Sequence, residues 1–189
     1  MPSWVNLPNL LTLFRLLLTP VVVYEILAGH YWLGGWLFGA AAFTDILDGA
    51  AARGMHVTTP VGAYLDPIAD KCLLGGVFLA LAGARIVPWW LVALILGRDL
   101  YILAGAAIAM RWTTIRSFPP SIWGKLSTFV QIMTVVLWIA RTIFQAPVLH
   151  EFSSLSLWLC VAFTVWSGVD YTRRAILAHR NIDAVRAWE

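Results

Sequence analysis

The hydrophobic pattern divides the chain into six apolar segments, separated by short polar or proline-containing turns. A helix needs about 20 mostly apolar residues to cross the hydrocarbon core of a bilayer. The sequence predicts such helices over residues 9–28, 31–53, 61–84, 87–110, 121–143 and 152–169, with residue 178 as an alternative end of the last. The predicted fold is therefore an all-α integral membrane protein of six transmembrane helices, forming one domain over residues 1–189.

Composition supports a membrane protein and argues against a nucleic-acid binder. Hydrophobic residues make up 60% of the chain and charged residues 12%, whereas soluble domains carry about 25% charged residues. The mean hydropathy is +0.78. The net charge of +3 is small. Basic residues near helix ends therefore indicate contact with anionic membrane lipids rather than with nucleic acid.

The distribution of lysine and arginine predicts the orientation of the chain. Six spans place both termini on one side, and cytoplasmic segments are enriched in these residues. The side with the termini would hold ten of them: Arg15, Arg53, Lys71, Arg111, Arg116, Lys125, Arg173, Arg174, Arg180 and Arg186. The other side would hold Arg85 and Arg141, since Arg98 lies inside a predicted span. Both termini are predicted to be cytoplasmic, in a bacterial or organellar inner membrane.

One stretch, residues 45–71, concentrates charge in this apolar chain. Six of the 23 Asp, Glu, Lys and Arg residues lie there: Asp45, Asp48, Arg53, Asp66, Asp70 and Lys71. Ionisable residues within membrane segments are costly and by default mark a functional site. The stretch joins the second predicted helix to the third, so the site is expected near the cytoplasmic face.

The spacing of the four aspartates predicts a shared site. Asp45 and Asp48 are three residues apart, and Asp66 and Asp70 are four apart, so each pair lies on one helix face. Small residues about one turn away leave room beside the carboxylates: Gly49, Ala52 and Gly62. The short turn over 54–60 allows the two helices to pair antiparallel. We therefore expect the four carboxylates to converge.

Converging carboxylates predict a hard divalent cation. In a low dielectric they cannot all ionise unaided, so either some stay protonated or cations neutralise them. Oxygen ligands suit Mg²⁺, Mn²⁺ or Ca²⁺, which are typical of phosphate chemistry. Arg53 and Lys71 flank the cluster and can hold phosphate. A nucleotide or phospholipid headgroup is therefore the expected substrate.

Two other interpretations explain less of the stretch. Helix-end ion pairs would account for the charges, but capping does not require paired carboxylates with a glycine at the matching turn of each helix. A divalent-cation transporter would account for the carboxylates but not for the basic residues. Transporter sites also lie near the bilayer midplane, whereas this cluster lies at a helix end.

The stretch resembles the signature of the CDP-alcohol phosphatidyltransferase family. All eight fixed positions and their spacings match: Asp45-x2-Asp48-Gly49-x2-Ala52-Arg53-x8-Gly62-x3-Asp66-x3-Asp70. Residues 6–15 also look like the first helix of this family. The resemblance implies six transmembrane helices, usually in a homodimer, and a polar cavity open to the cytoplasm. It also implies CDP-diacylglycerol as the donor and CMP as the leaving group.

The resemblance further implies a role for each motif residue. Asp45, Asp48 and Asp66 would be metal ligands, and Asp70 would be the general base with a further metal contact. The residues expected to bind the CDP-lipid are Asn9, Thr12, Asp48, Gly49, Arg53, Gly62 and Lys71. Asn9 and Thr12 form a polar stripe with Arg15 at i, i+3 and i+6, and we expect this stripe to reach the active cavity.

The motif leaves two acceptors open. One branch of the family uses sn-glycerol 3-phosphate and makes phosphatidylglycerol phosphate; the other uses phosphatidylglycerol and makes cardiolipin. Gly97-Arg98-Asp99 looks more like the cardiolipin branch, and Ser127 stands where glycerophosphate enzymes commonly place a second lysine. These features favour phosphatidylglycerol. The acceptor-binding candidates are Arg98, Arg111, Arg116 and Lys125; Arg98 is alternatively a structural ion pair with Asp99, and the others are alternatively positive-inside anchors.

Overall fold

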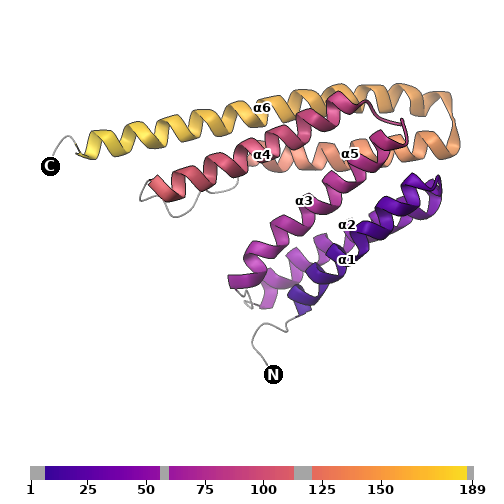
Figure 1. Cartoon of the computed structure of the whole chain (residues 1–189), viewed down its shortest axis with the longest axis horizontal. Coiled ribbons are helices and arrows are strands. Elements are labelled where there is room, and N and C mark those ends of the chain that lie inside the picture. Colours follow the sequence, from indigo (N-terminus) through magenta and orange to yellow (C-terminus); the bar gives the residue numbers. More distant parts are fainter. Residues whose placement is uncertain (1–6, 56–59, 113–120, 187–189) are drawn as a thin grey trace. The chain divides into compact units, whose positions relative to one another are not determined.

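The computed structural model describes residues 7–55, 60–112 and 121–186, and these residues form six helices with no strand. Side chains are described over 12–44, 68–105 and 121–177. The helices are α1 (Leu7–Leu27), α2 (Tyr31–Met55), α3 (Pro60–Gly83), α4 (Trp89–Trp112), α5 (Ile122–Phe144) and α6 (Pro147–Arg186) (Figure 1). The predicted all-α architecture of six helices is confirmed.

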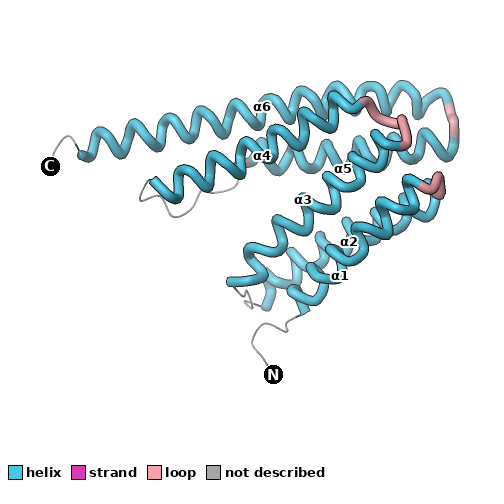
Figure 2. The backbone as a smooth tube through the Cα atoms, viewed as in Figure 1, coloured by secondary structure: helices cyan, strands magenta, loops and turns pink. Residues whose placement is uncertain are grey.

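Most predicted helix bounds agree with the structure, but the last helix is much longer than predicted. It has 40 residues rather than the 18 of the predicted span 152–169, or the 27 that the alternative end at residue 178 would give. The hydrophobic pattern marks only the apolar part of a helix, and the polar residues after Val169 continue it. Left-handed residues follow α1 and α3, namely Gly29 (φ 85°) and Arg85 (φ 59°), and produce the tight turns visible in Figure 2.

The described helices belong to two compact units. Unit 1 comprises Met1–Val92 and Val135–Ser153, and unit 2 comprises Ala93–Thr134 and Ser154–Glu189. Helices α1, α2 and α3 lie entirely in unit 1, whereas α4, α5 and α6 each begin or end there and contribute most of unit 2.

In unit 1, α1 packs against both α2 and α3, and the three helices lie side by side (Figure 1). The core between them is apolar and includes the fully buried Val22, Ile26, Val77 and Phe78. Gly76 lets α3 approach α1 closely, since a Cβ atom there would lie 3.2 Å from Val23 Cγ2. Small residues commonly permit such close packing between membrane helices.

Gly76→Val is expected to destabilise this packing. A Cβ at position 76 would also lie 3.3 Å from Thr19 Cγ2, so the additional methyl groups of valine force α1 and α3 apart. Overpacking a core typically costs about 1–3 kcal/mol. Thermal unfolding in detergent, followed by tryptophan fluorescence, should show a lower melting temperature. The matched control is Gly39→Val, because a Cβ at Gly39 meets nothing within 4 Å; equal melting temperatures for both variants would contradict the packing.

In unit 2, a line of buried polar side chains joins α5 to α6. Gln131 is 1% exposed, and its Nε2 donates to Ser127 Oγ and Thr164 Oγ1, both at 3.4 Å. The Thr134 hydroxyl donates to the Ser156 carbonyl at 3.2 Å. Polar groups in membrane helices are satisfied across helix interfaces in this way, so these bonds fix the register between the two helices.

Large apolar side chains cover much of the outer surface. Leu17, Trp36, Leu103 and Trp158 are each more than 55% exposed, and soluble proteins rarely carry such extensive apolar surface. Among the described residues, α5 and the Pro147–Leu177 part of α6 have the length and apolar composition needed to cross a membrane.

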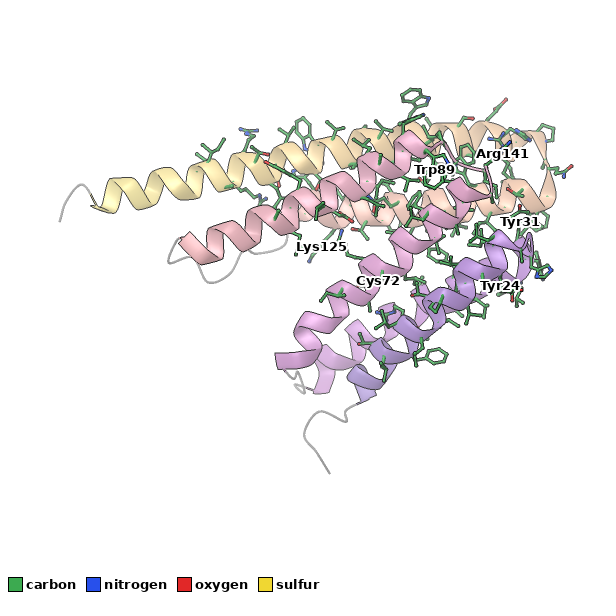
Figure 3. All side chains as sticks on the ribbon, viewed as in Figure 1. Tyr24, Tyr31, Cys72, Trp89, Lys125 and Arg141 are labelled. Carbon is green, nitrogen blue, oxygen red and sulfur yellow. The ribbon has the colours of Figure 1, made fainter. Side chains whose placement is uncertain are left out.

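Aromatic side chains gather at one end of unit 1. Tyr24 and Tyr31 flank the turn after α1, and Trp89 opens α4 at the same end (Figure 3). Tyr24 and Trp89 are 67% and 59% exposed. Exposed tyrosine and tryptophan concentrate at the boundary between membrane and water, so this end has the character of an interfacial belt.

Candidate active site

The backbone places the charged stretch on two consecutive helices of unit 1. Asp45 and Asp48 lie in the last three turns of α2, and Asp66 and Asp70 lie in the first three turns of α3. Only four residues separate the two helices, and an extended residue spans at most about 3.6 Å. The helix ends that carry the aspartates are therefore held within about 20 Å of each other.

The structure describes the backbone of the motif residues but few of their side chains. It confirms the predicted positions of the four aspartates on helices, whereas the side chains of Asp45, Asp48 and Asp66 are not among those described. Four other candidates for the motif or for CDP-lipid binding also lie outside the described side chains: Asn9, Gly49, Arg53 and Gly62. The convergence of the four carboxylates stays a prediction.

Asp70 is the one motif aspartate whose side chain the structure describes. Its Oδ1 accepts a hydrogen bond from Arg15 Nη1 at 2.7 Å. The Arg15 side chain is 2% exposed, whereas that of Asp70 is 43% exposed. A buried arginine on α1 thus contacts an open carboxylate on α3, 55 residues further along the chain.

Two further residues predicted to bind the CDP-lipid lie near Arg15 and Asp70 in the chain. Thr12 is 4% exposed and lies one turn before Arg15 on α1, so the expected polar stripe is buried at this position. Lys71 follows Asp70 on α3 and is exposed. The Thr19 hydroxyl donates to the Arg15 carbonyl at 2.9 Å, which adds a polar contact one turn beyond the ion pair.

Arg98, the first acceptor candidate, has partners on both α4 and α6. Its Nη1 donates to Asp99 Oδ1 at 2.7 Å, and its Nη2 donates to Ser167 Oγ. The guanidinium also lies 5.8 Å from the centre of the Tyr171 ring, within cation–π range. The side chain is 9% exposed. The structure therefore contains the Arg98–Asp99 ion pair, which was one of the two interpretations.

Arg98 also lines a groove between α4 and α6 in unit 2. The groove has a volume of about 400 Å³ and an otherwise largely apolar lining that includes Leu94, Tyr101, Val165 and Val169. Besides Arg98, its lining includes the polar residues Tyr101, Thr164 and Thr172. This association of Arg98 with an apolar groove could not be read from the sequence.

The other acceptor candidates are less completely described. Lys125 is exposed and lies in the first turn of α5 (Figure 3). Arg111 lies in the last turn of α4, but its side chain is outside the described set, and Arg116 lies outside the described residues.

Polar contacts that the sequence did not indicate fasten α6 to the start of α5 and to α4. The Ser121 hydroxyl donates to Asp170 Oδ2, which also accepts from Arg174 Nε at 2.9 Å. The Tyr101 and Thr172 hydroxyls lie 2.8 Å apart. Ser121 and Asp170 are 49 residues apart in the chain, and Tyr101 and Thr172 are 71 apart, so no local spacing links these two pairs.

The described side chains contain no group of three or more His, Cys, Asp or Glu residues able to hold a metal ion. Three of the four motif aspartates are outside that set. The donor chemistry nevertheless fits a hard cation, since four carboxylates stand on two helix ends joined by four residues. The residues that would hold it are Asp45, Asp48, Asp66 and Asp70.

Comparison with known proteins decides between the possible functions of this stretch. The profile of the CDP-alcohol phosphatidyltransferase family matches residues 5–166. The chain belongs to the CDP-alcohol phosphatidyltransferase family. It is a membrane enzyme that acts in phospholipid synthesis, and the expected family resemblance is confirmed.

The relatives fall into two groups by acceptor. A "Probable phosphatidylglycerophosphate synthase" from Mycobacterium tuberculosis is 36% identical, over 96% of this chain and 85% of the relative. A "CDP-diacylglycerol--glycerol-3-phosphate 3-phosphatidyltransferase" from Bacillus subtilis is 32% identical, over 88% and 93%. A "Cardiolipin synthase (CMP-forming)" from Rattus norvegicus is 30% identical, over 90% and 63%. Both acceptor classes are therefore represented among similar proteins.

Proposed function

We propose that the enzyme transfers the phosphatidyl group of CDP-diacylglycerol to phosphatidylglycerol, which forms cardiolipin and releases CMP. The acceptor hydroxyl attacks the phosphorus that bears the diacylglycerol, and the bond from that phosphorus to CMP breaks. Family membership supports the donor half of this reaction. The choice of acceptor depends on residues outside the motif.

The observation that carries the choice of acceptor is the charge balance around Arg98. Glycerol 3-phosphate is a phosphate monoester, a group with about −1.5 to −2 charge near pH 7, and in the groove it would require cations in addition to Arg98, whereas the groove lining contains no other lysine or arginine. Arg98 already pairs with Asp99 at 2.7 Å, and Ser127 is fully buried against Gln131. The apolar groove beside Arg98 instead suits a lipid acceptor, whose phosphodiester carries less charge.

The four basic residues retain their proposed roles in acceptor binding. Arg98 would face the headgroup from the groove, and the exposed Lys125 would attract anionic lipid at the start of α5. Arg111 and Arg116 belong to the same proposed set because they follow Arg98 in the segment that leads to α5.

In the donor half, Asp45, Asp48 and Asp66 hold divalent metal, with Asp70 as a further ligand. Seven residues bind the cytidine diphosphate and the lipid: Asn9, Thr12, Asp48, Gly49, Arg53, Gly62 and Lys71. Bound Mg²⁺ or Mn²⁺, or Ca²⁺ in the same site, would offset the charge that develops on the leaving CMP. Asp70 takes the proton of the attacking hydroxyl, a role that its 43% exposed carboxylate supports.

We further propose that all six helices cross the membrane, with both termini and the active site at the cytoplasmic face of a bacterial or organellar inner membrane. The excess of lysine and arginine on that side supports this orientation. The family profile covers both units over residues 5–166, which supports a single catalytic domain. The proposed assembly is a homodimer.

The acceptor can be tested with purified enzyme, CDP-diacylglycerol and Mg²⁺. We expect CMP release with phosphatidylglycerol and at least 10-fold less with sn-glycerol 3-phosphate, about the discrimination that 1.4 kcal/mol provides. Release with glycerol 3-phosphate alone would assign the enzyme to phosphatidylglycerophosphate synthesis. Thin-layer chromatography of the lipid product gives an independent result, because cardiolipin and phosphatidylglycerol phosphate migrate differently.

A further inference from the structure

We propose that Arg15 is a positioning residue for Asp70: its guanidinium fixes the carboxylate in the orientation that receives the acceptor's proton. This inference rests on the proposed role of Asp70 as the general base. It assigns a function to a residue outside the eight-position motif, on a helix that the motif does not include.

The ion pair between Arg15 and Asp70 is unusual because Arg15 lies within the apolar interface between α1 and α3. On α1, residues 12, 15, 19, 22 and 26 follow the three- and four-residue spacing of a helix seam, and Val22 and Ile26 are fully buried in it. On α3, Asp70 precedes the buried Leu73 and Val77 with the same spacing. The Arg15–Asp70 pair therefore occupies a seam between α1 and α3 where apolar side chains would otherwise pack.

Stability alone does not account for a charged pair at such a site. Arg15 is buried, and removing a charge from water costs free energy that an ion pair offsets only in part. The exposure of this pair is also unequal, with Arg15 at 2% and Asp70 at 43%. The arginine is thus enclosed while the carboxylate presents an open surface, which is the arrangement expected of a fixed support behind a reacting group.

The chemical consequence is control of carboxylate orientation. In the transfer step the acceptor oxygen bonds to phosphorus, the phosphorus–oxygen bond to CMP breaks, and the hydroxyl proton moves to the Asp70 carboxylate. Proton transfer requires that carboxylate within about 3.2 Å of the hydroxyl oxygen. A misplacement near 1 Å can reduce the rate about 100-fold. The 2.7 Å bond from Arg15 Nη1 to Asp70 Oδ1 restricts that movement.

A double-mutant cycle distinguishes positioning from a purely structural role. The variants are Arg15→Gln, Arg15→Lys, Asp70→Asn and Arg15→Gln/Asp70→Asn, assayed for CMP release from radiolabelled CDP-diacylglycerol. We expect Arg15→Gln to lower kcat about 100-fold while KM for CDP-diacylglycerol changes less than about 2-fold. Arg15→Lys should recover part of the loss. In the Asp70→Asn background, Arg15→Gln should cause no further loss, because coupled residues are non-additive.

Arg174→Gln is the matched control, since it breaks another Arg–Asp ion pair, with Asp170 on α6, and should leave kcat and KM unchanged. The inference would be overturned if Arg15→Gln lowered kcat by the same factor in the wild-type and Asp70→Asn backgrounds. It would also be overturned if Arg15→Gln alone left kcat unchanged. Should Arg15→Gln not fold, Arg15→Lys completes the same cycle with the charge retained. Wild-type turnover in Asp70→Asn alone would refute the base assignment itself, so the two failures are distinguishable.

Discussion

Asp70→Asn is expected to leave only a small residual turnover and to keep the fold intact. An amide is nearly isosteric with a carboxylate but cannot accept the acceptor's proton, and general-base catalysis typically contributes about 10²- to 10⁴-fold. The asparagine side-chain oxygen can still accept a hydrogen bond from Arg15, which now contacts Asp70 at 2.7 Å. We therefore expect the packing of α1 on α3 to persist while the chemical step slows by about 10²- to 10⁴-fold.

The measurement is CMP release under saturating donor and acceptor, combined with size-exclusion chromatography and thermal unfolding in detergent. Glu25→Gln is the matched control, because it neutralises another carboxylate of unit 1 that contacts a side chain, here His30 Nδ1 at 2.7 Å. It should keep near-wild-type kcat. Turnover near the wild-type level in Asp70→Asn would remove Asp70 from the base role.

Chelation of divalent cations is expected to have an effect of similar size. Four carboxylates on the end of α2 and the start of α3 are the oxygen donors that Mg²⁺ and Mn²⁺ prefer. Dialysis against EDTA should stop CMP release, and added Mg²⁺ or Mn²⁺ should restore it. Asp66→Asn should raise the metal concentration for half-maximal rate, by analogy with the roughly 10- to 100-fold losses that follow from perturbing metal-site ligation.

Asp170→Asn provides the control for this experiment, since Asp170 lies on α6 and bonds to Ser121 and Arg174 instead. Its metal requirement should match that of the wild type. Full activity after exhaustive chelation would contradict a metal-dependent transferase. Metal flux in proteoliposomes tests the transporter interpretation directly, and we expect none.

The sequence predicted the helices well because a long apolar segment is a local property of the sequence. Five of the six helices agree with their predicted bounds to within a few residues. The exception is α6, which continues from Val169 to Arg186 through polar sequence. Hydrophobicity records where a helix meets lipid, whereas backbone hydrogen bonds continue wherever the residues tolerate helical geometry.

The sequence also predicted the donor half of the candidate site. Spacings of three and four residues place carboxylates on one helix face whatever the rest of the fold does. The motif from Asp45 to Asp70 therefore indicated the family through residue type and spacing, and the family profile confirmed that membership. The acceptor half has no comparable local pattern, and relatives of both acceptor classes match the chain.

By itself, then, the sequence determined the six-helix architecture, the family and the reaction type, because each depends on periodicity or spacing within short segments. Only the tertiary structure decided which distant side chains meet. It pairs Arg15 with Asp70 across 55 residues and Arg98 with Ser167 across 69. Such contacts depend on which helix faces pack together, a result of the whole set of interhelical contacts that no single segment encodes.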